Sequence, residues 1–302
     1  RDRGTLCLQV QPRRAFQVSL GASFGYDMDG RHEANRRYWD GLAGEWEQLR
    51  DQDERWRRCA QEPSLAFDGA ALEMIEEYAG DLDGKQVCVI GSGDNLAAFA
   101  LAGMGAAVTS SDISEGQLGV AEKRASELGL DLNFVRCDAA DLAPLAGDRF
   151  DLVCSTNGFF VWIANLEGVF SAVYRVLKPG GHYVFYDVHP FLRPWVDQRV
   201  PIEMEKPYFE TGPFVEMEPG GSVYEFHWTM GDLLNGLMHA GLVLRALAES
   251  PAGDSRFWQD HAYLPGTDAS LLDWRSNPRA GLPVWLTVVA QKPDASRVSG
   301  RV

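Results

Sequence analysis

Short apolar runs alternate with longer segments whose apolar positions lie three or four residues apart, over most of the chain beyond residue 80. The short runs are typical of buried strands, and the longer spacing is typical of helices that pack on one face. The predicted strands are Val87–Ile90, Ala107–Ser111, Leu132–Cys137, Phe150–Ser155, His182–Val188, Leu242–Ala248 and Val284–Ala290. The predicted helices are Leu96–Leu101, Ser114–Leu128, Leu166–Leu177 and Thr229–His239. This alternation predicts an α/β fold with a doubly wound, mostly parallel sheet.

Two regions depart from the alternation. Residues 28–80 are rich in Trp, Arg and Glu near their start, which predicts an N-terminal segment of amphipathic helices. Between 189 and 228, repeated prolines interleave with aromatic residues, which excludes a helix or a central strand and predicts a lid or small antiparallel insert. We therefore expect a main domain over 81–292 that includes this insert, which would cover the substrate, followed by a flexible tail at 293–302.

The first 27 residues lack an initiator Met and show no clear period. They are typical of a tag, a leader or a disordered extension, with Met28 as the expected native start.

Composition limits the classes of partner. The chain has 43 acidic against 28 basic residues, a net charge of −15, and this negative field repels a phosphate backbone, so nucleic acid is not expected to bind. No apolar run is long enough to span a bilayer, so no membrane partner is expected. The five cysteines form no CxxC pair and are typical of reduced thiols in a cytoplasmic protein. No His, Cys and carboxylate spacing indicates a metal site, and the oligomeric state leaves no sequence signal.

Three successive strand ends carry polar elements. The first predicted strand runs into Gly91-Ser92-Gly93, and glycines there allow a tight turn and a close approach of a ligand to the backbone. Asp112 ends the second strand, where a carboxylate suits the two hydroxyls of a ribose, and Asp138 ends the third, where it suits an adenine amino group. Ligands of open α/β sheets bind at the carboxyl ends of strands, so the three elements predict one nucleoside site.

These segments resemble the class I S-adenosylmethionine (SAM)-dependent methyltransferases, and most of all the bacterial small-molecule enzymes of the ubiquinone/menaquinone-biosynthesis type. The resemblance covers about residues 35–292 and rests on the segments 87–93, 111–114, 137–139, 150–153 and 175–181. It implies a Rossmann-like seven-stranded sheet with an antiparallel last strand. It also implies transfer of a methyl group from SAM to a small-molecule acceptor by in-line displacement, which leaves S-adenosylhomocysteine.

The resemblance also implies which residues contact SAM. They are Gly91, Ser92, Gly93, Asn95, Asp112, Ile113, Asp138, Ala139, Ser155 and Asn157. Two positions depart from the family pattern. Val89 stands where the family often has an acid that helps to hold the SAM amino group, and Asn95 stands where it often has a third glycine. Asn95 is expected to cap the following helix or to touch the SAM carboxylate.

The acceptor side is predicted from residues that would cover the crevice. A base is needed only if the nucleophile must lose a proton, and the candidates are His189, at the end of the fifth strand, and His227, in the insert. Aromatic side chains are expected to bound the acceptor pocket, to stabilise the SAM sulfonium by a cation–π contact, or to form the core of the lid. They are Tyr38, Trp39, Trp162, Tyr208 and Trp228.

Two other functions remain open from the sequence. An NAD(P)-dependent oxidoreductase also uses a Gly-x-Gly turn and an acid at the second strand, but Leu96 occupies its third glycine position. A non-catalytic SAM-binding or interaction protein would keep the nucleoside site without turnover. Titration with NADH and with S-adenosylhomocysteine, followed by an acceptor panel, separates the three.

Overall fold

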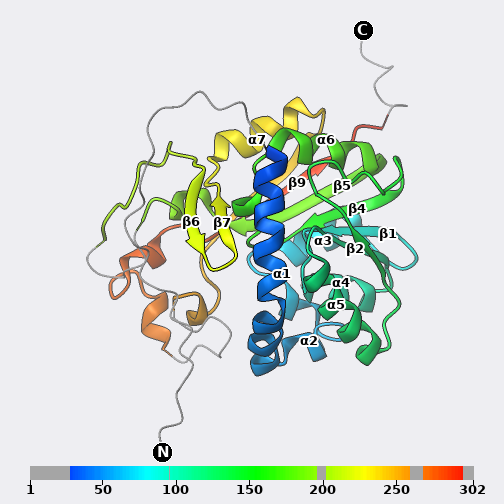
Figure 1. Ribbon diagram of the computed structural model, residues 1–302, viewed down its shortest axis with the longest axis horizontal. Coiled ribbons are helices and arrows are strands. Elements are labelled where there is room, and N and C mark those ends of the chain that lie inside the picture. The colour runs from blue at the N-terminus through cyan, green and yellow to red at the C-terminus, as the bar shows by residue number, and fades with distance from the viewer. Residues whose placement is uncertain (1–27, 95, 196–201, 259–267, 295–302) are drawn as a thin grey trace, which may run out of the picture.

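The computed structural model describes residues 28–94, 96–195, 202–258 and 268–294. Its centre is a seven-stranded sheet in the order β3-β2-β1-β4-β5-β9-β8, with β9 antiparallel to both neighbours (Figure 1). The strands are β1 (Gln86–Ile90), β2 (Ala107–Asp112), β3 (Asn133–Arg136), β4 (Phe150–Ser155), β5 (Leu177–Val188), β8 (Val243–Ser250) and β9 (Trp285–Gln291). The predicted α/β fold with an antiparallel last strand is confirmed.

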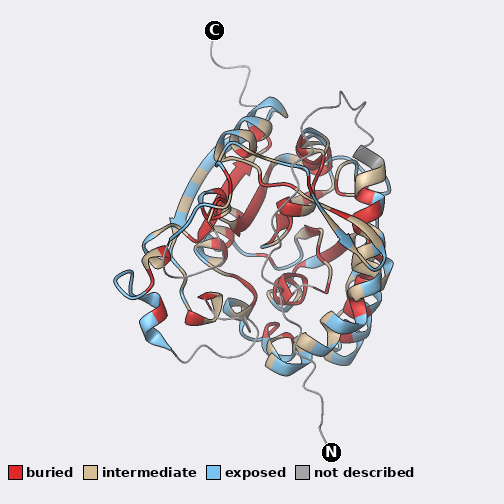
Figure 2. Cartoon of the chain, turned by 60° about the vertical axis from the view of Figure 1, so that its left-hand side comes forward, coloured by how far each residue is buried: buried red, intermediate tan, exposed pale blue. Residues whose placement is uncertain are grey.

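Helices cover both faces of this sheet. The helices of the α/β unit are α3 (Ala71–Ala79), α4 (Leu96–Gly103), α5 (Glu115–Leu128), α6 (Leu166–Val176) and α7 (Met230–His239). Alternate residues of β1 point to opposite faces: Val87 and Val89 pack with α3, α4 and α5, whereas Cys88 and Ile90 pack with α6 and α7. Both faces of β1 are therefore covered, which is why this strand is a continuous apolar run. Figure 2 shows that the buried residues gather on the strands of the sheet.

Helix caps account for several boundaries. Ser114 accepts a hydrogen bond from the Gln117 N–H at the start of α5, and Thr229 and Asp232 form a reciprocal capping box at the start of α7. Helix α3 has no such cap, because its N-cap residue is Ala70, which makes no side-chain hydrogen bond.

The N-terminal segment contains α1 (Met28–Asp53) and the short helix α2 (Arg55–Arg58). Helix α1 lies across the front of the molecule in Figure 1, beside α5 and the strand β7. Residues 1–27 and 295–302 lie outside the described residues, so the expectations for a leader and a flexible tail remain predictions.

The proline-rich insert contains a small antiparallel sheet of β6 (Phe214–Glu218) and β7 (Gly221–Glu225). The insert thus has no long helix among its described residues, as its prolines predict. Asn35 of α1 attaches to this hairpin, because its side-chain amide bonds the backbone of Tyr224 in both directions, at 2.8 and 2.9 Å. Among the described residues, no helix is long and apolar enough to cross a membrane.

Candidate functional site

The turn after β1 has the backbone that its glycines allow. Gly91 and Gly93 have φ values of 55° and 49°, in the left-handed region that favours glycine. A Cβ at Gly91 would lie 2.3 Å from the ring of Phe159, so this glycine makes room for a side chain of the loop after β4. The Gly93 N–H donates to Asp112, and the Ser92 hydroxyl pairs with that of Ser110 at 2.6 Å. Asn95 lies outside the described residues.

Asp112 ends β2 directly beside this turn. Its carboxylate accepts the N–H groups of Gly93 and Ser114, each at 2.8 Å, and remains partly exposed. Each oxygen keeps a lone pair, so the carboxylate can still accept two hydroxyls. Burial, with a smaller contribution from Asp40, raises the pKa of Asp112 to about 6. The neighbouring Ile113 is half-buried and follows it on the same loop.

Asp138 follows β3 at the same edge of the sheet, because β2 and β3 are parallel and pair Asp112 with Arg136. Its carboxylate accepts from the Ala140 N–H at 2.8 Å and from the ring of His32 at 2.7 Å. Burial is the largest single effect and opposes the charge of this group, but the hydrogen bond and charge of His32, together with the Ala140 N–H, outweigh it and hold the pKa of Asp138 below its usual value. The backbone of Ala139, which is buried, lies between these contacts.

His32 was not anticipated from the sequence. It lies on α1, is 4% exposed, and accepts the Ala164 N–H on Nε2 at 2.9 Å, so its Nδ1 carries the proton that goes to Asp138. The ring thus joins α1 to the end of β3 and to the segment after β4. One oxygen of the Asp138 carboxylate therefore already accepts a hydrogen bond from His32, where an adenine amino group was expected to donate.

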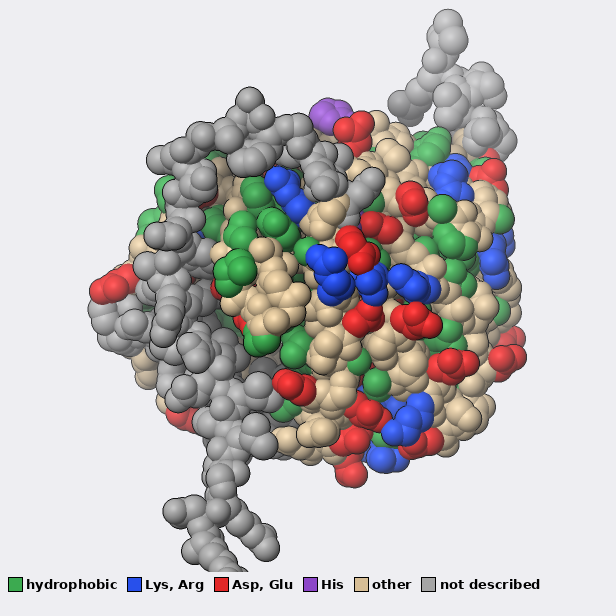
Figure 3. Space-filling view, viewed as in Figure 1, with side chains coloured by type: hydrophobic (Ala, Val, Ile, Leu, Met, Phe, Trp, Pro, Cys, Tyr) green, Lys and Arg blue, Asp and Glu red, His purple; other side chains and the backbone are tan. Residues whose placement is uncertain are grey.

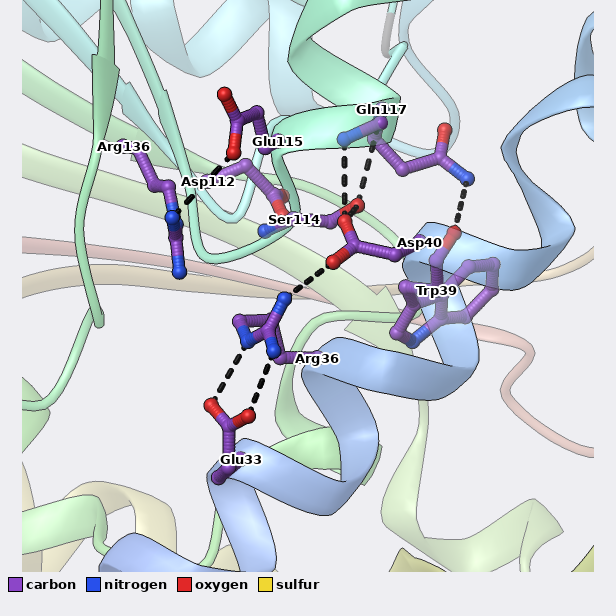
Figure 4. A network of polar contacts seen from close by, with 10 residues as sticks. Glu33, Arg36, Trp39, Asp40, Asp112, Ser114, Glu115, Gln117 and Arg136 are labelled. Atoms are coloured by element: carbon purple, nitrogen blue, oxygen red, sulfur yellow. Dashed lines mark hydrogen bonds and ion pairs between the residues drawn. The ribbon is translucent and has the colours of Figure 1, made fainter. Parts of the chain in front are cut away.

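Helix α1 is attached to the start of α5 as well (Figure 4). Asp40 accepts the Ser114 hydroxyl at 2.7 Å and the Gly116 N–H at 3.1 Å, and the Gln117 amide donates to the Trp39 carbonyl. Charged side chains of both signs interleave over the centre of this face of the molecule (Figure 3). These contacts hold α1 over the ends of β2 and β3.

The loop after β4 lies between the glycine turn and Asp187, at the end of β5. Asp187, at the end of β5, accepts the N–H groups of Gly158 and Phe160 at 2.9 and 3.0 Å, and burial raises its pKa. This fixes the loop so that Phe159 lies against Gly91. The Ser155 hydroxyl is buried against Tyr183 at 2.7 Å, whereas Asn157 is exposed on the loop.

The aromatic residues predicted for the acceptor side lie in three places. Tyr38, Trp39 and Trp162 pack together, with ring centroids 5.2 to 5.9 Å apart, where α1 meets the loop after β4. Trp228 lies at the C-terminal end of the insert. Its ring stacks on that of Phe226, and its indole N–H donates to the Ile163 carbonyl. Tyr208 stands apart from both: its ring contacts Phe191 and Phe209, and its hydroxyl accepts the Met230 N–H.

The two candidate bases differ in what their ring nitrogens do. His189 is 4% exposed, its Nδ1 accepts the Phe191 N–H, and its Nε2 bonds Glu249 at 2.8 Å. Both nitrogens are engaged by the protein, which favours a structural role for His189, and its role as a base stays a prediction. His227 keeps Nδ1 without a partner among the described residues.

Replacing His189 by alanine should lower stability and spare turnover. The change removes a buried ring and leaves the Phe191 N–H without its acceptor, which costs about 1–3 kcal/mol of unfolding free energy, whereas Glu249 is exposed to water and adds little. Urea denaturation measures the first effect and single-turnover kinetics the second. A loss of the chemical rate in a folded variant would return His189 to the list of catalytic candidates.

Comparison with known proteins agrees with the fold. Residues 88–185 match the profile of a family described as a methyltransferase domain. A SAM-dependent methyltransferase from Mesorhizobium loti has the same fold, with a TM-score of 0.55, 23% identity, and coverage of 74% of this chain and 98% of that one. Residues 88–185 are thus similar to a methyltransferase domain, and the whole fold is similar to that of a SAM-dependent methyltransferase.

Two curated relatives show what the chain is similar to. A ubiquinone biosynthesis O-methyltransferase from Shewanella pealeana is 29% identical over 126 residues, which is 42% of this chain and 53% of that protein. A ubiquinone/menaquinone biosynthesis C-methyltransferase from Desulfotalea psychrophila is 27% identical over 250 residues, 77% of this chain and 88% of that protein. The chain thus spans about half the length of the O-methyltransferase relative.

Proposed function

We propose that this protein transfers the methyl group of SAM to a small organic acceptor. The observation that carries the proposal is the meeting of the Gly91–Gly93 turn, Asp112 and Asp138 at the carboxyl ends of three adjacent strands. Support for the cofactor comes from Asp112, which is partly exposed and keeps lone pairs for two ribose hydroxyls. SAM supplies an electrophilic methyl group when it is bound, so the protein has no bond-breaking group to provide.

The chain's own contribution is to hold and enclose the reactants. Gly91–Gly93 would take the methionine part, Asp112 the ribose, and Ile113 the adenine face, while Asp138 and Ala139 read its edge. Helix α1 lies over these elements, and its contacts with Asp138 and Ser114 would exclude water from the site. The net charge of −15 repels a phosphate backbone, which supports a small acceptor and not nucleic acid. The four described cysteines are free thiols, which supports a cytoplasmic location.

Isothermal titration with S-adenosylhomocysteine tests the cofactor assignment directly. Saturable binding with one site, and none with NADH, is the expected result, and the reverse would favour an oxidoreductase. Binding without methyl transfer to any of a broad panel of phenols, amines, acids and enols would favour a non-catalytic SAM-binding protein.

The affinity for S-adenosylhomocysteine should depend on pH through Asp112. An ionised carboxylate accepts hydroxyl hydrogen bonds more strongly than a protonated one, and the pKa of Asp112 is raised to about 6. We therefore expect constant affinity above pH 7 and a progressive loss as the pH falls through 6. Titrations between pH 5 and 8 measure it, and Asp112→Asn should flatten the profile. A flat profile in the wild-type protein would contradict the ribose role.

A further inference from the structure

Asp138 is held by two hydrogen bonds that come from different parts of the chain. Its Oδ1 accepts the Ala140 N–H at 2.8 Å, from the loop that carries Asp138 itself. Its Oδ2 lies 2.7 Å from Nδ1 of His32, which is 106 residues away on α1. Each oxygen therefore has one donor, and each keeps a second lone pair for a ligand.

The carboxylate is open to a ligand, whereas the imidazole is closed. The side chain of Asp138 is 28% exposed, and that of His32 is 5% exposed. A purine base that reaches the end of β3 can contact the carboxylate but meets little of the ring. The effect of His32 on such a ligand is therefore exerted through Asp138.

The tautomer of His32 is fixed by a third residue. Its Nε2 accepts the Ala164 N–H at 2.9 Å, and a ring nitrogen that accepts carries no proton. The proton of the neutral imidazole is therefore on Nδ1, where it points at Asp138. Because Ala164 lies between β4 and α6, two separate loops at this edge of the sheet determine the orientation of the ring.

His32 also keeps the carboxylate charged. Burial is the largest effect on the pKa of Asp138 and raises it, but the hydrogen bond from His32, its charge when protonated, and the Ala140 N–H together hold this pKa below its usual value. An ionised carboxylate only accepts hydrogen bonds, whereas a protonated one also donates. The carboxylate is thus a pure acceptor while His32 is in place.

A pure acceptor distinguishes purines that differ at the 6 position. The 6-amino group of adenine donates a hydrogen bond to it, whereas the 6-oxo group of hypoxanthine is itself an acceptor and leaves both oxygens unsatisfied. The N1–H of hypoxanthine lies further round the ring, and it would reach Asp138 only if the nucleoside moved away from Asp112. Sites built to bond one polar group reject an analogue without it because their own polar atoms lose a partner.

We propose that His32 is a positioning residue through which the nucleoside site selects a 6-amino purine over a 6-oxo purine. It donates to one oxygen of Asp138 and thereby fixes the plane and the charge of the carboxylate. This inference rests on the proposed methyltransferase function and adds the residue of α1 on which recognition of the cofactor base depends.

Helix α1 does not depend on His32 alone for its place. Asn35 bonds the backbone of β7 in both directions, and Asp40 accepts hydrogen bonds from the start of α5. These contacts remain in a His32 variant, so α1 is expected to stay docked while the donor to Asp138 is lost. Asn35→Leu is the converse control, because it removes an anchor of α1 and leaves His32 and Asp138 unchanged.

Two amide variants separate the two contacts of the ring. An asparagine amide reaches the place of Nδ1 and can still donate to Asp138, whereas a glutamine amide reaches the place of Nε2 and can still accept from Ala164. Asparagine is the poorer helix former, so a merely structural role predicts the larger damage in His32→Asn. The positioning role predicts the opposite order for base selection, with the larger loss in His32→Gln.

Isothermal titration of the full chain compares S-adenosylhomocysteine with S-inosylhomocysteine, its analogue with a 6-oxo base. The wild-type protein should bind the adenosine compound at least about tenfold more tightly. This ratio should fall at least about threefold in His32→Gln and stay within about twofold in His32→Asn and Asn35→Leu. Both ligands have the same ribose, so the contribution of Asp112 cancels from the ratio.

Each outcome decides between distinct claims. Equal affinities in the wild-type protein, an unchanged ratio in His32→Gln, or equal losses in His32→Gln and His32→Asn overturn the inference even if S-adenosylhomocysteine binds normally. Failure to bind either nucleoside overturns the proposed function instead. If the His32 variants do not fold, the wild-type protein still decides: S-adenosylhomocysteine must shift the ¹⁵N resonance of His32 Nδ1 more than S-inosylhomocysteine does, and equal or absent shifts overturn the inference.

Discussion

Replacing Asp112 by alanine should weaken the binding of S-adenosylhomocysteine by roughly ten- to a hundredfold. The carboxylate is partly exposed beside the glycine turn, and losing a charged acceptor costs about 1.5–3 kcal/mol. A second effect adds to the first, because Asp112 also accepts the Gly93 N–H and thereby fixes the turn itself. Isothermal titration at pH 7.5 measures the change.

Asp151 provides a matched control for this experiment. It too is a carboxylate on a central strand and accepts a backbone N–H, that of Gln86, but it lies at the start of β4, at the opposite end of the sheet. Asp151→Ala should therefore leave the affinity unchanged while removing a contact with Lys178. Equal losses in the two variants would mean that Asp112 acts through stability alone and would remove the ribose assignment.

The sheet was predictable because its determinants are local. Strands buried on both faces must be apolar throughout, so β1 and β4 stand out as runs, and each is bounded by polar residues or glycine. The position of Asp112 is predictable for the same reason, because a strand end fixes where the next side chain lies. Parallel pairing then places Asp138 at the same edge.

The contacts of α1 could not be predicted in this way. The bond between His32 and Asp138 joins residues 106 positions apart, and no local pattern specifies that pairing. The sequence does contain a partial signal, because one face of α1 carries polar residues at helical spacing. This face is formed by His32, Asn35, Trp39 and Asp40, and in the structure each of them is buried or half-buried. A polar face of this kind indicates that a helix docks on hydrogen-bonding groups instead of on an apolar core.

The insert shows a different limit. The run Phe214–Glu218 alternates in part as a strand should, but Val215 and Met217 point outward, with Met217 78% exposed. Hydrophobic alternation therefore identifies such a strand without saying which face is buried. Likewise, sequence alone does not distinguish His189 from His227, because the partner that engages His189 is Glu249, 60 residues away.

Replacing Arg124 by methionine should lower the free energy of unfolding by about 3–5 kcal/mol. This arginine of α5 is 1% exposed and donates to Asp94 at 2.6 Å, to Asp51 at 3.1 Å and to the Glu47 carbonyl at 2.9 Å. Methionine fills much of the volume beside Trp56 but leaves the buried Asp94 carboxylate without its principal partner. Breaking a buried pair from one side costs far more than the pair's net contribution to stability.

Urea denaturation of three variants separates charge from packing. Lys123→Met removes the neighbouring, exposed cation that pairs with Glu47 and should change stability little. The double variant Arg124→Met/Asp94→Asn removes both buried charges and should recover a substantial part of the loss, because no isolated carboxylate remains. No recovery would assign the effect to lost packing against Trp56. Because Asp94 directly follows Gly93, the single variant should also weaken S-adenosylhomocysteine binding, which links the anchoring of α1 to the shape of the glycine turn.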